Sequence, residues 1–180
     1  AANAPLGAHG LLYAPYLVGE RTPYADANIR GSFIGVDARQ QPADFVRAVM
    51  EGVTFPFKDI LNLYAAQGRY FKRMVAIGGG AKSQLWLQIQ ADIFNLPVVS
   101  LTSEQGPGLG AAMVAAVGLD WFKDFETCAR QFVHYNEPIC PIPENVAQYA
   151  KLYQLYHEIY LATKKLSVKL AEFRSGTNHV

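Results

Sequence analysis

An apolar run that breaks into three consecutive glycines and then continues as a helical pattern is the feature that most constrains this fold. The run RMVAI, residues 73–77, is typical of a buried strand. The glycines occupy 78–80, and apolar side chains then recur at spacings of three and four over residues 83–95. Such a strand–turn–helix places unpaired backbone N–H groups beside the end of the strand, where they can hold a phosphate.

The rest of the chain alternates between short apolar runs and longer helical patterns. The sequence predicts further strands at 10–17, 32–36 and 97–101, and helices at 42–68, 104–119, 121–130 and 145–173. Short strands come first and strand–helix alternation follows, which predicts an α/β domain with a mixed sheet flanked by helices. The tyrosines of the last helix, Tyr149, Tyr153, Tyr156 and Tyr160, are interpreted as packing and surface residues rather than a nucleic-acid platform.

Composition excludes several classes of protein. The chain has 180 residues, 51% of them hydrophobic, and a net charge of +1, which suits one globular domain and gives no electrostatic reason for nucleic-acid or membrane-surface binding. No apolar stretch has the length of a membrane span, and no signal peptide is visible. Cys128 and Cys140 are expected to be reduced thiols of a cytoplasmic protein. The four histidines show no ligand spacing, so no metal site is expected.

The glycine turn fits neither of two well-known phosphate-binding patterns fully. A Walker A loop needs glycine directly before Lys-Ser and another glycine five residues earlier, whereas Ala81 precedes Lys82 and Ala76 holds the earlier place. A dinucleotide-binding fingerprint needs a third glycine where Ser83 stands, although Glu104 lies where a ribose-binding acid would be expected. NAD binding by a small Rossmann-type domain therefore stays an alternative.

A third interpretation is a glycine-rich turn that lies under a nucleotide. Glycines allow a positive φ and a close approach of the backbone to a ligand. Ser83 can cap the following helix or contact the ligand through its hydroxyl. A tight turn and a helix cap without any ligand is the alternative to this interpretation.

Four motifs in order resemble the C-terminal domain of the FGGY carbohydrate kinases. They are YAPYLVGERTP (13–23), GSFIGVDARQQPADFVRAVME (31–51), the glycine turn with its flanking strand and helix (74–92), and EQGPGLGAA (104–112). The resemblance extends from about residue 10 to residue 170, and the first motif has the form seen in xylulokinases.

This resemblance implies a ribonuclease-H-like, actin-like ATPase fold, in which two domains close around a cleft. The chain would be the incomplete second domain of such a two-domain kinase. Residues 1–173 would form the nucleotide-binding C-terminal domain, truncated at its N-terminal side, and 174–180 a flexible tail. The D-x-G-T phosphate motif, the second phosphate loop and the aspartate base would all lie upstream of residue 1.

The resemblance also assigns roles to individual residues. Gly79 and Ser83 would contact the nucleotide, while Gly78 and Gly80 would shape the turn. Arg21 and Arg30 would face the interdomain cleft, with a Glu20–Arg21 pair holding their loop.

Neither a catalytic residue nor a metal ligand is expected in this chain. Asp26, Asp92 and Glu20 are interpreted as solvated or capping acids, because none of them is placed to act as the base.

The activity implied is ATP-dependent phosphorylation of D-xylulose to D-xylulose 5-phosphate by the full-length enzyme, with Mg²⁺ accompanying ATP. The partners would be ATP or ADP and, through the other domain, the sugar, and the protein is expected to form a homo-oligomer. The chain alone is expected to bind nucleotide weakly and to be inactive. The alternatives are a kinase for gluconate, ribulose or glycerol, and a non-catalytic nucleotide-binding module.

Overall fold

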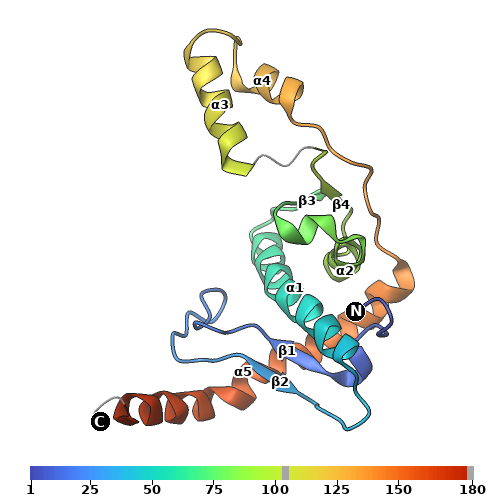
Figure 1. Ribbon diagram of the computed structural model, residues 1–180, viewed down its shortest axis with the longest axis vertical. Helices are drawn as coiled ribbons and strands as arrows, with labels where there is room; N and C mark the ends of the chain where they lie inside the picture. The colour runs from blue at the N-terminus through green and yellow to red at the C-terminus, as the bar shows by residue number, and fades with distance from the viewer. Residues whose placement is uncertain (103–105, 178–180) are drawn as a thin grey trace. The chain divides into compact units, whose positions relative to one another are not determined.

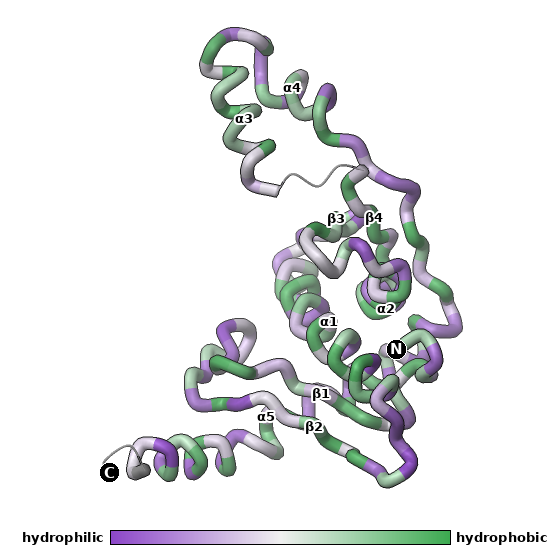
Figure 2. Tube along the Cα trace, in the orientation of Figure 1, coloured by the Kyte–Doolittle hydropathy of each residue, from purple (hydrophilic) through white to green (hydrophobic). Residues whose placement is uncertain are grey.

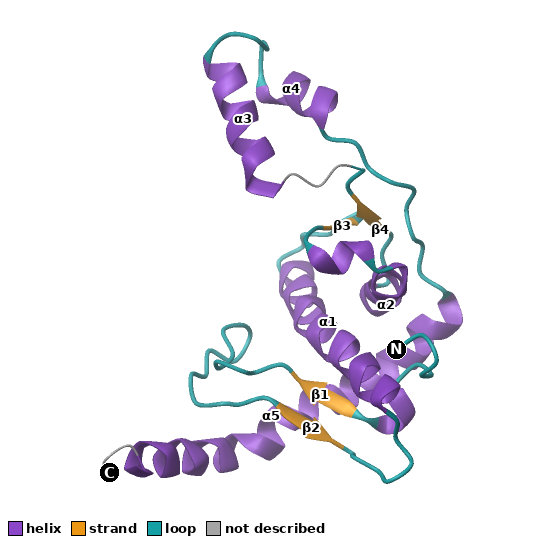
Figure 3. Ribbon diagram, viewed as in Figure 1, coloured by secondary structure: helices purple, strands orange, loops and turns teal. Residues whose placement is uncertain are grey.

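The computed structural model describes residues 1–102 and 106–177. Helices dominate, and the strands are only three residues long (Figures 1 and 3). The α-helices are α1 (Pro42–Ala66), α2 (Gln84–Phe94), α3 (Gly106–Gly118), α4 (Phe125–Phe132) and α5 (Pro143–Thr177). The strands are β1 (Leu12–Ala14), β2 (Ser32–Ile34), β3 (Met74–Ala76) and β4 (Val98–Ser100), and the short 3-10 helices are η1 (Ala8–Gly10) and η2 (Gly79–Lys82).

The chain forms two compact units. Unit 1 comprises Ala1–Tyr70, Asp92–Asn95 and the chain from Pro141 onward, and unit 2 comprises Phe71–Ala91 and Leu96–Cys140. Each unit has its own two-stranded sheet. In the part of the chain that the structure describes, no helix has both the length and the apolarity needed to cross a membrane.

Unit 1 is built around α1 and the antiparallel pair of β1 and β2, in which Tyr13 lies opposite Phe33. The helix starts with a capping box between Gln41 and Asp44 and runs without a break through Pro56. Gly52 lets the helix approach β1, because a Cβ atom there would lie 2.1 Å from the carbonyl oxygen of Tyr13. This close contact fixes how α1 lies on the hairpin.

Helix α5 packs on α1 and β1 and supplies most of the aromatic core of unit 1. Its four tyrosines, which are Tyr149, Tyr153, Tyr156 and Tyr160, are all buried, which confirms their packing role. The ring centroid of Phe55 lies 4.9 Å from that of Tyr156 and 5.7 Å from that of Tyr153.

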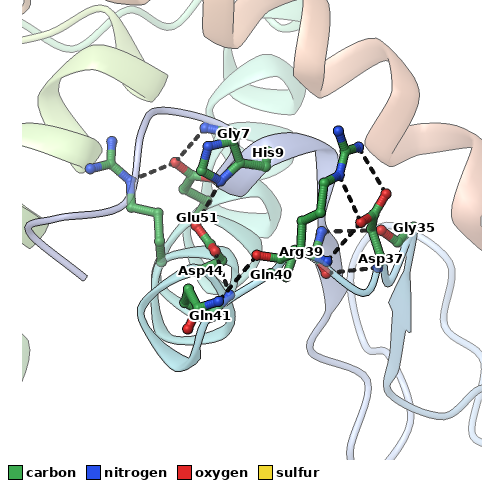
Figure 4. Close-up of polar contacts among 10 residues, drawn as sticks. Gly7, His9, Gly35, Asp37, Arg39, Gln40, Gln41, Asp44 and Glu51 are labelled. Carbon is green, nitrogen blue, oxygen red and sulfur yellow. Dashed lines mark hydrogen bonds and ion pairs between the residues drawn. The ribbon is translucent and has the colours of Figure 1, made fainter.

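A polar cluster closes the same core near the chain start (Figure 4). The Glu51 carboxylate accepts hydrogen bonds from Arg47 Nε at 2.7 Å, from the Tyr149 hydroxyl at 2.8 Å and from the Gly7 backbone N–H at 3.0 Å. Arg47 Nη2 also donates to the Tyr149 hydroxyl at 2.8 Å. All three donors thus compensate for the burial of Glu51 Oε1, whereas Glu51 Oε2 is buried without a hydrogen-bond partner among the described residues.

In unit 2, β3 and β4 pair in parallel, with Met74 opposite Val98 and Ala76 opposite Ser100. Residues 134–139 run beside β4 through isolated antiparallel bridges. Helices α3 and α4 pack on each other, and α4 is capped by Asp124, whose carboxylate accepts from the Thr127 N–H at 2.8 Å. Figure 2 shows the predominantly hydrophobic colour of α3.

The expectation of one mixed sheet is wrong for the described residues, which contain two separate two-stranded sheets. Pro15 follows β1 and Gly35, with a φ of +85°, follows β2, so the first pair ends at residues that cannot extend a regular ladder. Strand β3 ends at the glycine turn. The last helix continues to Thr177, beyond the predicted end at residue 173, and 178–180 lie outside the described residues.

Candidate functional site

The candidate site begins where the parallel strands β3 and β4 end. After β3 the chain passes Ile77 and turns at Gly78, whose φ of +78° is readily adopted by glycine only. The 3-10 helix η2 follows directly, and α2 starts after Ser83. Because ligands in α/β folds bind beyond the carboxyl ends of parallel strands, this turn stands where a ligand is expected.

Ser83 caps α2. Its Oγ accepts a hydrogen bond from the Trp86 N–H at 3.3 Å, and its carbonyl accepts from the Leu87 N–H at 3.0 Å. Gly80 packs closely on Trp86, because a Cβ atom there would lie 3.1 Å from the Trp86 ring, which would have to shift slightly. A Cβ atom on Gly79, in contrast, would meet nothing within 4 Å, so the backbone there is open to an approaching group.

A pocket of about 470 Å³ lies at this edge of the small sheet, within the size range of small-molecule sites. It is lined mainly by polar side chains from the strand ends, the glycine turn, the start of α2 and the segment beside β4. The lining residues are Ala76, Ala81, Lys82, Gln84, Ser100, Leu101, Thr102 and Asn136.

The lining residues that follow β4 form a small hydrogen-bonded group with Asn136. Asn136 Nδ2 donates to Ser100 Oγ at 2.9 Å and to the Leu101 carbonyl at 3.2 Å. The Asn136 backbone N–H donates to the Ser100 carbonyl at 2.8 Å. Sequence reasoning missed Ser100, Thr102 and Asn136, since no local pattern marks a residue whose position depends on pairing with β4.

The chemistry of this pocket suits a polar or anionic ligand rather than a metal ion. Lys82 is exposed and supplies a positive charge, while the side chains of Ser100, Thr102 and Asn136 supply hydroxyl and amide groups. None of the lining residues named above is a carboxylate, and no group of three or more potential metal ligands occurs among the residues that the structure describes. The lining can therefore bind and orient a ligand but offers no carboxylate base.

The four predicted nucleotide residues, Gly78, Gly79, Gly80 and Ser83, all lie in the one turn that leads to α2. Their neighbours Ala81 and Lys82 line the pocket. Contact of the four residues with a nucleotide stays a prediction. Glu104, considered above as a ribose-binding acid, lies outside the described residues.

The two predicted cleft arginines belong to the loop between β1 and β2 in unit 1. Arg30 Nη1 donates to the carbonyls of Ala27 and Ile29, both at 2.7 Å, whereas the Arg21 side chain is exposed. The expected Glu20–Arg21 pair is absent from the ion pairs of the described residues. The Glu20 carboxylate instead accepts from the Thr22 N–H at 2.7 Å.

The remaining acids that sequence analysis considered have structural partners. The Asp92 carboxylate, buried in unit 1, accepts from the Ile142 N–H and from Asn145 Nδ2, both at 2.8 Å, and so caps the start of α5. Asp26 accepts from the Asn28 N–H at 2.9 Å. These contacts confirm the capping roles.

Comparison with known proteins agrees with the motifs. A family profile described as "FGGY family of carbohydrate kinases, C-terminal domain" matches residues 1–119. The chain is 51% identical to the xylulose kinase of Bacillus subtilis (strain 168), over 96% of this chain and 34% of that protein.

Two solved structures from Lactobacillus acidophilus are similar as well. A gluconate kinase has a TM-score of 0.82 at 36% identity, and a ligand-bound xylulose kinase has a TM-score of 0.80 at 35% identity. Each match covers 94% of this chain and 34% of the other. The chain thus spans about a third of the length of the relatives that it matches.

Proposed function

The chain belongs to the FGGY family of carbohydrate kinases, and on this premise we propose that it is the nucleotide-binding C-terminal domain of a xylulose kinase. The whole enzyme would transfer the γ-phosphoryl group of ATP to D-xylulose and form D-xylulose 5-phosphate. The similarity to xylulose kinases over nearly the entire chain is the observation that carries this proposal. The proposal includes the ribonuclease-H-like, actin-like fold, of which this chain would be an incomplete second domain.

The polar pocket of unit 2 supports nucleotide binding. The N–H groups of Gly79 and Gly80 open a 3-10 turn, so they have no acceptor within that turn and can donate to a phosphate. Lys82 adds a positive charge, and the open space beside Gly79 permits close approach. The hydroxyls of Ser100 and Thr102 and the Asn136 amide suit the ribose or base.

The described pocket residues do not fit a Mg²⁺ site of their own, because Mg²⁺ is held by carboxylates and water and none of these residues is a carboxylate. We expect Mg²⁺ to accompany the phosphates of ATP. The aspartate base and most of the sugar contacts would belong to a domain outside this chain, so the chain alone would be inactive. Its share of catalysis would be positioning of the nucleotide.

Other parts of the proposal concern the surroundings of this site. Arg21 and Arg30 would face the sugar side of the cleft. The protein would form a homo-oligomer and work in the cytoplasm, which agrees with the two free thiols of Cys128 and Cys140.

Titration calorimetry of this chain with ADP, ATP and NAD tests nucleotide binding. We expect ADP and ATP to bind and NAD to bind more weakly. Gly79→Leu should abolish binding without unfolding the chain, because the new side chain fills the space that the ligand needs. Lys82→Gln should weaken binding, whereas the control Lys123→Gln, a substitution of another exposed lysine of unit 2, should not. Preferential binding of NAD would contradict the proposal.

A chimera tests the kinase assignment. This chain would replace the matching C-terminal third of the Bacillus subtilis xylulose kinase. We expect ATP-dependent phosphorylation of D-xylulose by the chimera and none by the chain alone. A folded chimera that binds ATP but transfers no phosphoryl group would refute the assignment.

Gluconate remains the second candidate substrate, since the similar gluconate kinase structure matches as well as the xylulose kinase structures do. Ribulose and glycerol kinases, and a non-catalytic nucleotide-binding module, are further alternatives. A parallel assay of a chimera built on the gluconate kinase, with gluconate as the acceptor, shows which of the two kinases this chain completes better.

A further inference from the structure

The loop that connects β1 to β2 is held by its own backbone at one end and by α5 at the other. Glu20 and Asp26 exchange two backbone hydrogen bonds of 2.8 Å, which close the loop. The Tyr160 hydroxyl donates to Asp26 Oδ2 at 3.1 Å, and the ring of Tyr24 stacks on that of Tyr160 with centroids 3.7 Å apart. The loop that carries Arg21 and Arg30 is therefore docked on α5 by two side chains.

A histidine of α5 joins this loop to α1. His157 Nδ1 lies 3.2 Å from the Tyr24 hydroxyl, and His157 Nε2 lies 3.1 Å from Asp59 Oδ1. The Tyr153 hydroxyl donates to the same Asp59 oxygen, and Asn62 Nδ2 donates to the Tyr153 hydroxyl at 3.0 Å. Asp59 is buried, whereas His157 is partly exposed.

The Asp59 contact requires a proton on His157 Nε2. An ionised carboxylate only accepts, so Nε2 donates to Asp59. The Tyr24 hydroxyl can donate to an unprotonated Nδ1 or accept from a protonated one, so its contact forms in either case. Burial raises the pKa of Asp59, and the hydrogen bond from Tyr153 and the nearby His157 counteract this shift.

We propose that His157 is a positioning residue that links Asp59 to Tyr24 and so fixes the loop of residues 20–30, including Arg21 and Arg30. The link connects two packed helices, α1 and α5, to this loop. Only the relevance of this loop to a sugar substrate rests on the proposed function. The link itself is a property of unit 1.

Hydrogen exchange of the 180-residue chain tests the proposal directly. His157→Leu removes both contacts, and Tyr24→Phe removes only the hydroxyl while it keeps the ring that stacks on Tyr160. Each should speed exchange of the Glu20 and Asp26 amides by about tenfold, the change expected for one lost hydrogen bond. The double variant should match the single ones, because both break the same link. No change at these amides, or additive effects, would overturn the proposal.

Two conservative variants test whether both contacts are needed. His157→Gln places its amide near the position of Nε2 and can still donate to Asp59. His157→Asn places its amide near the position of Nδ1 and can still contact Tyr24. Because each variant keeps only one of the two contacts, we expect neither to restore the protection lost in His157→Leu. Full protection in either variant would contradict a link that needs both contacts. His9→Gln is the matched control, since His9 Nδ1 lies 3.0 Å from Asp44 in the same unit but away from this loop.

Nitrogen NMR of the imidazole adds a signature that a purely steric role would not give. In the wild-type chain Nε2 should carry a proton, because it donates to Asp59. A ring protonated on Nδ1 alone would overturn the proposed link. Loss of loop protection in the variants of a chain that binds no nucleotide would leave the link standing and refute only the proposed function.

Discussion

Asp44 shows at the residue scale how one carboxylate can serve two neighbours. Its Oδ2 accepts from the Gln41 N–H at 2.8 Å, which closes the first turn of α1, and its Oδ1 lies 3.0 Å from His9 Nδ1 (Figure 4). The hydrogen bond from Gln41 and the contact with His9 lower the pKa of Asp44. Ionised Asp44 therefore favours the folded state.

The pH dependence of stability follows from this lowered pKa. In the unfolded chain the Asp44 carboxyl has a pKa of about 3.9. Its contribution to stability is therefore complete above that pH and is lost as the pH falls through the lower pKa of the folded state. We expect Asp44→Asn to lower the melting temperature at pH 6 and the difference from wild type to shrink in acid. Repeating the comparison in a His9→Gln background, which lacks the imidazole next to Asp44, measures how much of the difference depends on His9. A difference that grows in acid would contradict the assignment.

Breaking the buried Arg47–Glu51 pair is expected to destabilise the folded state more than the Asp44 substitution does. Arg47→Met leaves the Glu51 carboxylate without its charged partner among apolar side chains, and only 2% of the Glu51 side chain is exposed. Removing one partner of such a pair typically costs about 3–5 kcal/mol. Chemical denaturation should show this loss, while Arg130→Met, which breaks an exposed pair with Glu126, should have little effect. Equal effects would contradict the buried role of Arg47.

At the scale of elements, Gly52 sets the distance between α1 and β1. Gly52→Ala would place a methyl group 2.1 Å from the Tyr13 carbonyl oxygen, so strand and helix must separate. Overpacking of this kind costs about 1–3 kcal/mol. Gly176→Ala in α5 is the control, because a Cβ there meets nothing within 4 Å and alanine favours the helix. Denaturant midpoints measure both, and an unchanged midpoint for Gly52→Ala would contradict the close packing.

The helices could be predicted from the sequence because the spacing of apolar residues records one buried face. Pro42 marked the start of α1 correctly, and the glycine turn marked the start of α2. The sheets could not be predicted, since pairing joins residues far apart in sequence. The pocket residues Ser100 and Asn136 could not be predicted for the same reason, because Asn136 reaches Ser100 only through the bridges beside β4.

At the scale of the whole molecule, exposed apolar side chains predict self-association. Leu119 and Trp121, between α3 and α4, are 62% and 73% exposed. Exposed apolar clusters promote association between copies. We expect the chain to show a concentration-dependent mass in sedimentation experiments and the double variant Leu119→Lys, Trp121→Lys to reduce it. Gln154→Lys, at an exposed polar residue of α5 in unit 1, is the control. A strict monomer at high concentration would contradict this prediction.

The order of the two units along the chain has a consequence for recombination between related genes. The chain passes between them after Tyr70, Ala91, Asn95 and Cys140, so unit 1 includes both the start and the end of the sequence. Any single recombination between two related genes within this region divides unit 1 between the parents. A crossover between the codons of Glu51 and Tyr149 also separates the members of the buried polar cluster. Viable hybrids should therefore be those whose parents carry compatible residues at these positions.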